Sequence, residues 1–125
     1  MIAIAIDTSS LRRYATRVRG ADTEAVREGV ASRRAVIPPV VIAEAYSDPN
    51  LDDYTREMLE VLPRLLLLDG YWERTGLLRA AVLAKGFKAA LPDCLVAQSC
   101  IDHDIPLITH DHDFRHFTAA GLQLR

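Results

Sequence analysis

Five carboxylates in this sequence stand next to short apolar runs, where a fold would bring them to the end of a buried strand or the head of a helix. They are Asp7, Glu44, Asp93, Asp111 and Asp113. Carboxylate oxygens are the ligands that Mg²⁺ and Mn²⁺ prefer. Such a cation activates water and stabilises the oxygens of a phosphodiester during hydrolysis. These residue types therefore indicate metal-dependent phosphodiester hydrolysis, with all five acids as candidate metal-binding and catalytic residues.

The elements that would position these acids are apolar runs separated by helices. Short apolar runs predict strands at residues 2–6, 34–37, 65–68, 105–109 and 122–124. Parallel strands need helical crossovers of about ten or more residues between them. We therefore predict an α/β fold with a central parallel sheet of four to five strands flanked by helices.

Helix signals fall between the predicted strands. Start signals and helical periodicity predict helices at residues 11–18, 22–32, 40–46, 51–62, 71–85 and 94–101, the first of them capped by the Asp7-Thr8-Ser9-Ser10 segment. Asp7 and Asp93 stand at the heads of two of these helices, and a helix cap would explain either residue taken alone. Their joint placement with the other acids favours a shared site.

Ligands of open parallel sheets gather outside the carboxyl ends of the strands. Asp7 ends the first predicted strand, Glu44 lies in the helix after the second, and Asp93 heads the helix that leads to the fourth. Asp111 and Asp113 follow that fourth strand directly. So many negative charges in a small volume would raise their pKa values and destabilise the fold unless a cation neutralised them. We expect this cation to be Mg²⁺ or Mn²⁺.

Basic residues surround the acids along the chain and would form a rim for a phosphate backbone. The residues that could support the site or bind substrate are Thr8, Ser9, Thr109, Arg12, Arg13, Lys88 and Arg115. Charged helix faces are also commonly just solvated. A zinc site formed by His103, His110 and His112 is an alternative, but these residues lie in predicted loops and no cysteine pair accompanies them.

Length and composition are those of an ordinary domain. The 125 residues are half hydrophobic, enough for one domain over residues 1–125 with its own core, and the net charge of −2 gives no overall attraction to nucleic acid. Cys94 and Cys100 would lie too far apart on one helix for a disulfide and are expected to be reduced core thiols. Neither a signal peptide nor a membrane span is expected, so the protein is predicted to be cytoplasmic.

The ordered set of motifs resembles the PIN-domain proteins of the VapC toxin type over essentially the full chain. The resemblance rests on Ile-Asp7-Thr-Ser-Ser, Val-Ile-Ala-Glu44, Leu-Pro-Asp93-Cys-Leu-Val-Ala-Gln and Pro-Leu-Ile-Thr109-His-Asp111-His-Asp113-Phe. It implies a Mg²⁺- or Mn²⁺-dependent endoribonuclease, commonly a toxin that cleaves RNA such as tRNA or mRNA. It also implies a homodimer and a cognate antitoxin that inserts into the acidic groove.

The resemblance assigns roles to the acids. Asp7 and Asp93 correspond to the main metal ligands, Glu44 to the third acid, and either Asp111 or Asp113 to the last. Thr8 or Ser9 corresponds to the hydroxyl residue that supports the cluster in the family.

Three other classes of protein fit the sequence less well. A haloacid-dehalogenase-type phosphatase needs an acid two residues after the first Asp, where this chain has Ser9. A receiver domain needs a lysine before a late proline, and Ile105-Pro106 lacks it. A non-catalytic PIN-like module, binding RNA or a protein without turnover, is disfavoured because the acid set is complete.

Overall fold

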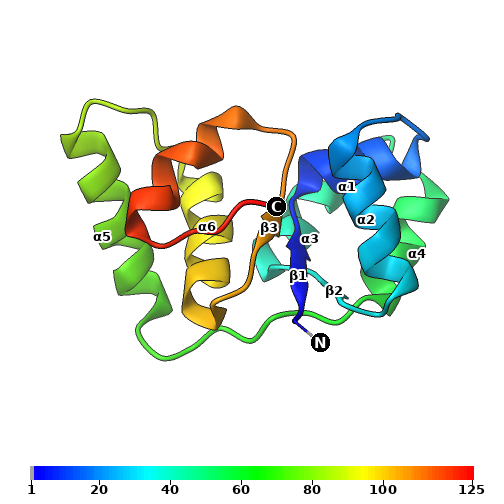
Figure 1. The fold of residues 1–125 in the computed structure, drawn as a ribbon, viewed down its shortest axis with the longest axis horizontal. Helices are drawn as coiled ribbons and strands as arrows, with labels where there is room; N and C mark the ends of the chain where they lie inside the picture. Colours follow the sequence, from blue (N-terminus) through cyan, green and yellow to red (C-terminus); the bar gives the residue numbers. More distant parts are fainter. Residues whose placement is uncertain (1) are drawn as a thin grey trace.

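A three-stranded parallel sheet lies at the centre of the computed structural model, which describes residues 2–125 (Figure 1). The middle strand is β1 (Ile4–Ile6), with β2 (Ala35–Val36) on one side and β3 (Leu107–Ile108) on the other. All three residues of β1 are buried, as expected for a parallel strand covered on both faces. The predicted α/β class and the parallel sheet are confirmed.

The prediction of four to five strands was wrong. In place of a strand at residues 65–68, the chain makes one isolated parallel bridge between Ile37 and Arg64. Pro63 has no N–H to donate, and the leucines from Leu66 to Leu68 are exposed. A run of leucines that faces solvent gains nothing from extending the sheet, so the pairing ends after one bridge.

The last predicted strand, at residues 122–124, is likewise reduced to a single parallel bridge, between Leu107 and Leu124. The N–H of Leu107 donates to the carbonyl of Gln123, and the N–H of Arg125 donates to the carbonyl of Leu107. Both expected extra strands therefore run beside the sheet without joining it as strands.

Helices account for most of the remaining chain and cover both sides of the sheet. They are α1 (Thr8–Ala15), α2 (Ala21–Ala31), α3 (Pro39–Tyr46), α4 (Asp53–Val61), α5 (Tyr71–Ala84), α6 (Leu91–His103) and the 3₁₀ helix η1 (His112–Ala120). Figure 1 shows α1, α2 and α4 at one end of the molecule and α5 and α6 at the other, with β1 between them. No helix within residues 2–125 has the length and apolar character needed to cross a membrane.

The helix α6 is the most deeply buried helix of the fold. Cys94, Val96, Ala97 and Cys100 are fully enclosed, and both cysteines are unpaired, as predicted. Burial raises the pKa of Cys100 to about 12, so this thiol stays protonated at neutral pH. Because α6 is fixed by packing on all sides, the residues of its first turn have a rigid support.

Candidate functional site

Asp7 links the sheet to the first helix. It follows β1 directly, is 5% exposed, and its N–H donates to the carbonyl of Ile108 at 2.9 Å. It occupies the N-cap position of α1, yet its side chain makes no capping hydrogen bond. Oδ2 instead accepts hydrogen bonds from Ser9 Oγ at 2.9 Å and Thr109 Oγ1 at 2.8 Å. A helix cap therefore does not explain this aspartate.

The two hydroxyls that hold Asp7 also tie it to the segment after β3. Thr109 Oγ1 accepts from the backbone N–H of Asp111 at 3.0 Å, and Ser9 Oγ accepts from that of His110 at 3.2 Å. Each hydroxyl thus donates to one carboxylate and accepts from one backbone amide. This arrangement fixes the loop that carries Asp111 relative to Asp7.

Glu44 is brought to the same edge by α3. Pro38 and Pro39 start this helix directly after the second strand region, and Thr8 Oγ1 donates to Glu44 Oε1 at 3.0 Å. Burial raises the pKa of Glu44, and the charge of Asp7 adds to the increase. Thr8 and Arg12 counter this effect by stabilising the charged form.

Asp93 lies in the first turn of α6. The helix begins at Leu91 with Ala90 as its N-cap, so a helix cap does not explain Asp93 either. Its pKa is raised to about 6, mainly by burial and then by the charges of the four other carboxylates: Asp111, Asp7, Glu44 and Asp113. The structure therefore brings the four other predicted acids within electrostatic reach of Asp93.

The two late aspartates differ in their surroundings. Asp111 is the N-cap of η1, where its Oδ1 accepts from the N–H of Asp113 at 2.9 Å. Burial is the main cause of the raised pKa values of Asp7 and Asp93, and the charge of Asp111 adds to both. The charge of Asp113 makes the smallest of the contributions to Asp93. Asp111 is thus coupled more closely to the centre of the acid cluster.

The donor set suits a hard divalent cation, because it offers carboxylate and hydroxyl oxygens without a nearby thiolate. Within residues 2–125, no three His, Cys, Asp or Glu side chains already stand in a metal-holding arrangement. The four other acids raise the pKa of Asp93, but the five do not form a closed ligand shell as they stand. Binding a cation would require the carboxylates to turn toward a common point.

The basic residues predicted to surround the acids lie in different places. Arg12 forms an ion pair with Asp48 at 3.6 Å, and Lys88 is exposed between α5 and α6. Arg13 and Arg115 line a cavity that also includes Asp111. Sequence reasoning overlooked Asp22, which holds Arg13 in this cavity. Its position in the first turn of a predicted helix resembled an ordinary helix-end acid and gave no specific signal.

The family model for the PIN domain matches residues 4–120. This chain belongs to the PIN domain family. A comparison with curated proteins finds no significant match.

Solved structures share the fold at low sequence identity. The crystal structure of VapBC2 from Rickettsia felis, bound to a DNA fragment from its promoter, gives a TM-score of 0.73 at 17% identity and covers 99% of this chain and 98% of that one. FitAcB from Neisseria gonorrhoeae gives 0.69 at 16% identity, covering 97% and 95%. DNA-bound VapBC from Salmonella typhimurium gives 0.69 at 16% identity, covering 100% and 98%.

Proposed function

We propose that this protein is a metal-dependent endoribonuclease that hydrolyses RNA phosphodiester bonds. The observation that carries the proposal is the convergence of four further carboxylates on Asp93, whose pKa is raised to about 6. Uncompensated negative charge of this kind destabilises a fold and is typical of functional sites. Membership of the PIN domain family supports the same conclusion.

Asp7, Glu44, Asp93 and Asp111 are proposed to hold Mg²⁺ or Mn²⁺, with Asp113 as the alternative to Asp111. The bound cation would polarise the scissile phosphate and lower the pKa of a water molecule. The chain itself keeps its acids oriented: Ser9 and Thr109 fix Oδ2 of Asp7, and Thr8 fixes Oε1 of Glu44. Hydroxyl donors also favour the ionised carboxylates that a cation requires.

We further propose that the protein is the toxin of a type II toxin–antitoxin pair. Two of the structural neighbours are VapBC complexes, from Rickettsia felis and Salmonella typhimurium, and FitAcB is a third neighbour. The expected partner is a small antitoxin protein that blocks the acidic groove. Growth arrest on expression, relieved by co-expression of a neighbouring small protein, tests this part separately from the nuclease activity.

Cleavage assays with the purified protein test the nuclease directly. Single-stranded and structured RNA are incubated with Mg²⁺, Mn²⁺ or EDTA, with Asp93→Asn in parallel. Asp69→Asn serves as the matched control, because Asp69 is an exposed aspartate in the segment before α5. We expect metal-dependent cleavage by the unmodified protein and by Asp69→Asn, and none by Asp93→Asn.

Two results would contradict the proposal. Cleavage by Asp93→Asn at the normal rate would remove the assigned site. No cleavage of either RNA with either metal would favour the non-catalytic alternative, a PIN-like module that binds RNA or a protein.

A further inference from the structure

A cavity of about 390 Å³ lies beside the acid cluster. It is bounded by α1, the start of α2, the segment from Thr109 to His112, η1 and the C-terminal residues, and its charged and histidine lining residues are Arg13, Asp22, His110, Asp111, His112, Arg115 and Arg125. Thr109 and Asp111 belong both to this cavity and to the hydrogen-bond network around Asp7. The cavity is therefore continuous with the proposed catalytic centre.

Among the described residues, Arg115 is the arginine of this cavity that has no acidic partner. Within residues 2–125, Arg13 pairs with Asp22 and Arg125 pairs with Glu28 at 3.2 Å, whereas Arg115 forms no ion pair. An exposed guanidinium without a carboxylate partner keeps all its donors available. Such a group recognises a phosphate by two parallel hydrogen bonds.

Arg13 is held in a fixed orientation at the same cavity. Its Nε and Nη2 atoms donate to the two carboxylate oxygens of Asp22 at 3.0 and 3.2 Å, and Ser10 Oγ donates to Asp22 Oδ2 at 2.8 Å. A guanidinium has five N–H donors, so this pairing leaves its remaining donors free. Because the orientation is fixed in advance, less conformational entropy is lost when a ligand binds.

We propose that this cavity binds the phosphodiester adjacent to the scissile one in the RNA substrate. Arg115 contacts that phosphate directly, and Asp22 is a positioning residue that holds Arg13 toward it. The proposal rests on the ribonuclease function proposed above and adds the path of the RNA: the strand leaves the acid cluster past Asp111 toward α2 and the C-terminal residues.

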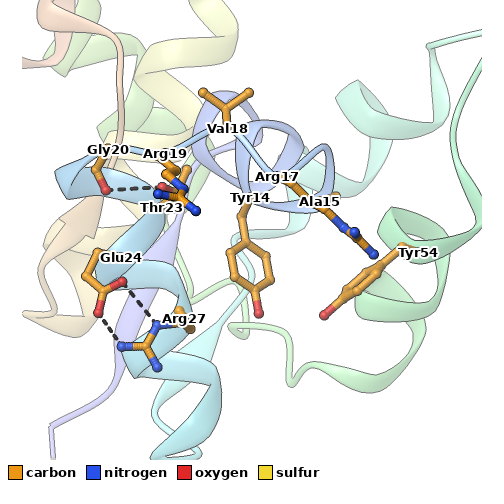
Figure 2. Close-up of a pocket in the computed structure, with 10 residues that line it drawn as sticks. All are labelled: Tyr14, Ala15, Arg17, Val18, Arg19, Gly20, Thr23, Glu24, Arg27 and Tyr54. Atoms are coloured by element: carbon orange, nitrogen blue, oxygen red, sulfur yellow. Dashed lines mark hydrogen bonds and ion pairs between the residues drawn. The ribbon is translucent and has the colours of Figure 1, made fainter.

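A larger cavity, of about 600 Å³, does not share this relation to the acids. Figure 2 shows it between the end of α1, the start of α2 and Tyr54 of α4, with Arg17 extending toward Tyr54 and Arg27 paired with Glu24. It adjoins the C-terminal end of α1, whereas Asp7 precedes the N-terminal end. Arg17 therefore provides a matched control, an exposed arginine that lines a cavity away from the acids.

Binding of a labelled single-stranded RNA tests the proposal, with Ca²⁺ in place of Mg²⁺ and the RNA checked for integrity on a gel. Affinity is measured over a range of salt concentrations for the unmodified protein, Arg115→Gln and Arg17→Gln. Loss of one phosphate contact on single-stranded RNA reduces the slope of log K against log salt by about 0.7. We expect this reduction, with at least about threefold weaker binding, for Arg115→Gln alone.

The positioning role of Asp22 needs a variant that keeps the local charge balance. Arg13→Gln alone would leave Asp22 without its partner and risks misfolding. The double variant Arg13→Gln/Asp22→Asn removes one positive and one negative charge, so the net charge is unchanged. We expect weaker RNA binding and an increased KM for cleavage with an unchanged kcat, at an unchanged melting temperature.

The outcomes separate this inference from the function on which it rests. If the unmodified protein cleaves RNA while Arg115→Gln and the double variant bind like Arg17→Gln, the cavity is not a phosphate site and the ribonuclease function stands. If Arg115→Gln weakens RNA binding but no cleavage occurs, the phosphate site stands and the nuclease function does not. An equal loss of affinity in Arg17→Gln and Arg115→Gln would show diffuse attraction and overturn the assignment.

Discussion

Asp93 is proposed to bind the catalytic metal, and its negative charge destabilises the folded protein when no metal is bound. Its pKa of about 6 lies above the value of about 3.9 for a solvated aspartate, mainly because the side chain is partly buried and next because other carboxylates surround it. The folded state therefore binds more protons than the unfolded state between these two values. Stability gained by protonation is present at low pH and is lost as the pH rises through 6.

Because the ionised Asp93 destabilises the fold above pH 6, the first prediction concerns Asp93→Asn in EDTA. At pH 7.5 the variant should be more stable than the unmodified protein by on the order of 1 to 2 kcal/mol, because it removes an unfavourable charge. The difference should shrink toward zero near pH 4.5, where Asp93 is protonated. Chemical denaturation at the two pH values measures it, and a difference that grows on acidification would contradict the assignment.

A second prediction for the same variant concerns the effect of the metal on the melting temperature. A cation that binds only the folded protein raises the melting temperature by mass action. Mg²⁺ or Mn²⁺ should therefore raise the melting temperature of the unmodified protein at pH 7.5 and should have little effect on Asp93→Asn. Equal increases in the two proteins would place the metal elsewhere.

Thr109 provides a prediction about support of the site. Thr109→Val keeps the shape of the side chain but removes the donor to Asp7 and the acceptor for the N–H of Asp111. Leaving these groups unpaired should cost about 1 to 3 kcal/mol of stability. We expect RNA cleavage to fall at least about tenfold, since one barrier change of about 1.4 kcal/mol has that effect. Thr109→Ser, which retains the hydroxyl, should restore most of both, as denaturation and cleavage assays will show.

At the scale of elements, the positions of the acids were predicted more accurately than the number of strands. Asp7 could be placed because a run of buried β-branched residues stops there and hydroxyl residues follow. The runs at 65–68 and 122–124 are also rich in leucine, but the pairing there is limited to one bridge at Arg64 and one at Leu124. Whether an apolar run joins a sheet depends on which neighbour covers it, and this is a property of the assembled fold.

The helix η1 was not predicted, although two local signals were present. Asp111 caps it through the N–H of Asp113, and Phe114 and Phe117 are buried three residues apart, the spacing of one helical face. No such signal predicted the ion pair between Asp22 and Arg13, because this pair joins α1 and α2 through a tertiary contact. Short-range patterns thus predicted the residues of the site, and only the fold revealed how its charges pair.

The helix that carries Asp93 is anchored to α5 by a charged network. Arg74 of α5 donates to both carboxylate oxygens of Asp102 at 2.9 and 2.6 Å, and Gln98 donates to Asp102 Oδ1 at 2.8 Å. The side chain of Asp102 is 6% exposed and that of Arg74 is 39% exposed. Solvent therefore screens one partner, so removing one partner should cost less than it does in a fully buried pair.

Removing only one partner of this network should be costly. We expect Arg74→Leu to destabilise the protein by about 1 to 3 kcal/mol, because Asp102 keeps its charge in a buried position. Arg74→Leu/Asp102→Leu should recover a large part of this loss. Denaturation of both variants and of Asp102→Leu gives the coupling energy, and simple additivity would contradict the anchoring role.

At the scale of the whole molecule, α5 carries apolar residues on both of its sides. Tyr71, Leu78 and Val82 face the interior, while Trp72 and Leu77 are exposed. Large apolar side chains that face solvent are typical of a surface that binds a partner. The homodimer implied by the resemblance to VapC-type proteins stays a prediction, and the exposed apolar residues of α5 are a surface at which it can be tested.

Sedimentation velocity over a range of concentrations tests this prediction. We expect a dimer for the unmodified chain, and a shift toward monomer for Leu77→Glu, because a buried charge in an apolar interface is costly. Val61→Glu is the matched control: Val61 is 79% exposed on α4 and Leu77 is 71% exposed on α5, so both substitutions place a glutamate at an open apolar position. Dissociation by Leu77→Glu but not by Val61→Glu would assign the interface to α5. A protein that is monomeric at every concentration would contradict the predicted homodimer.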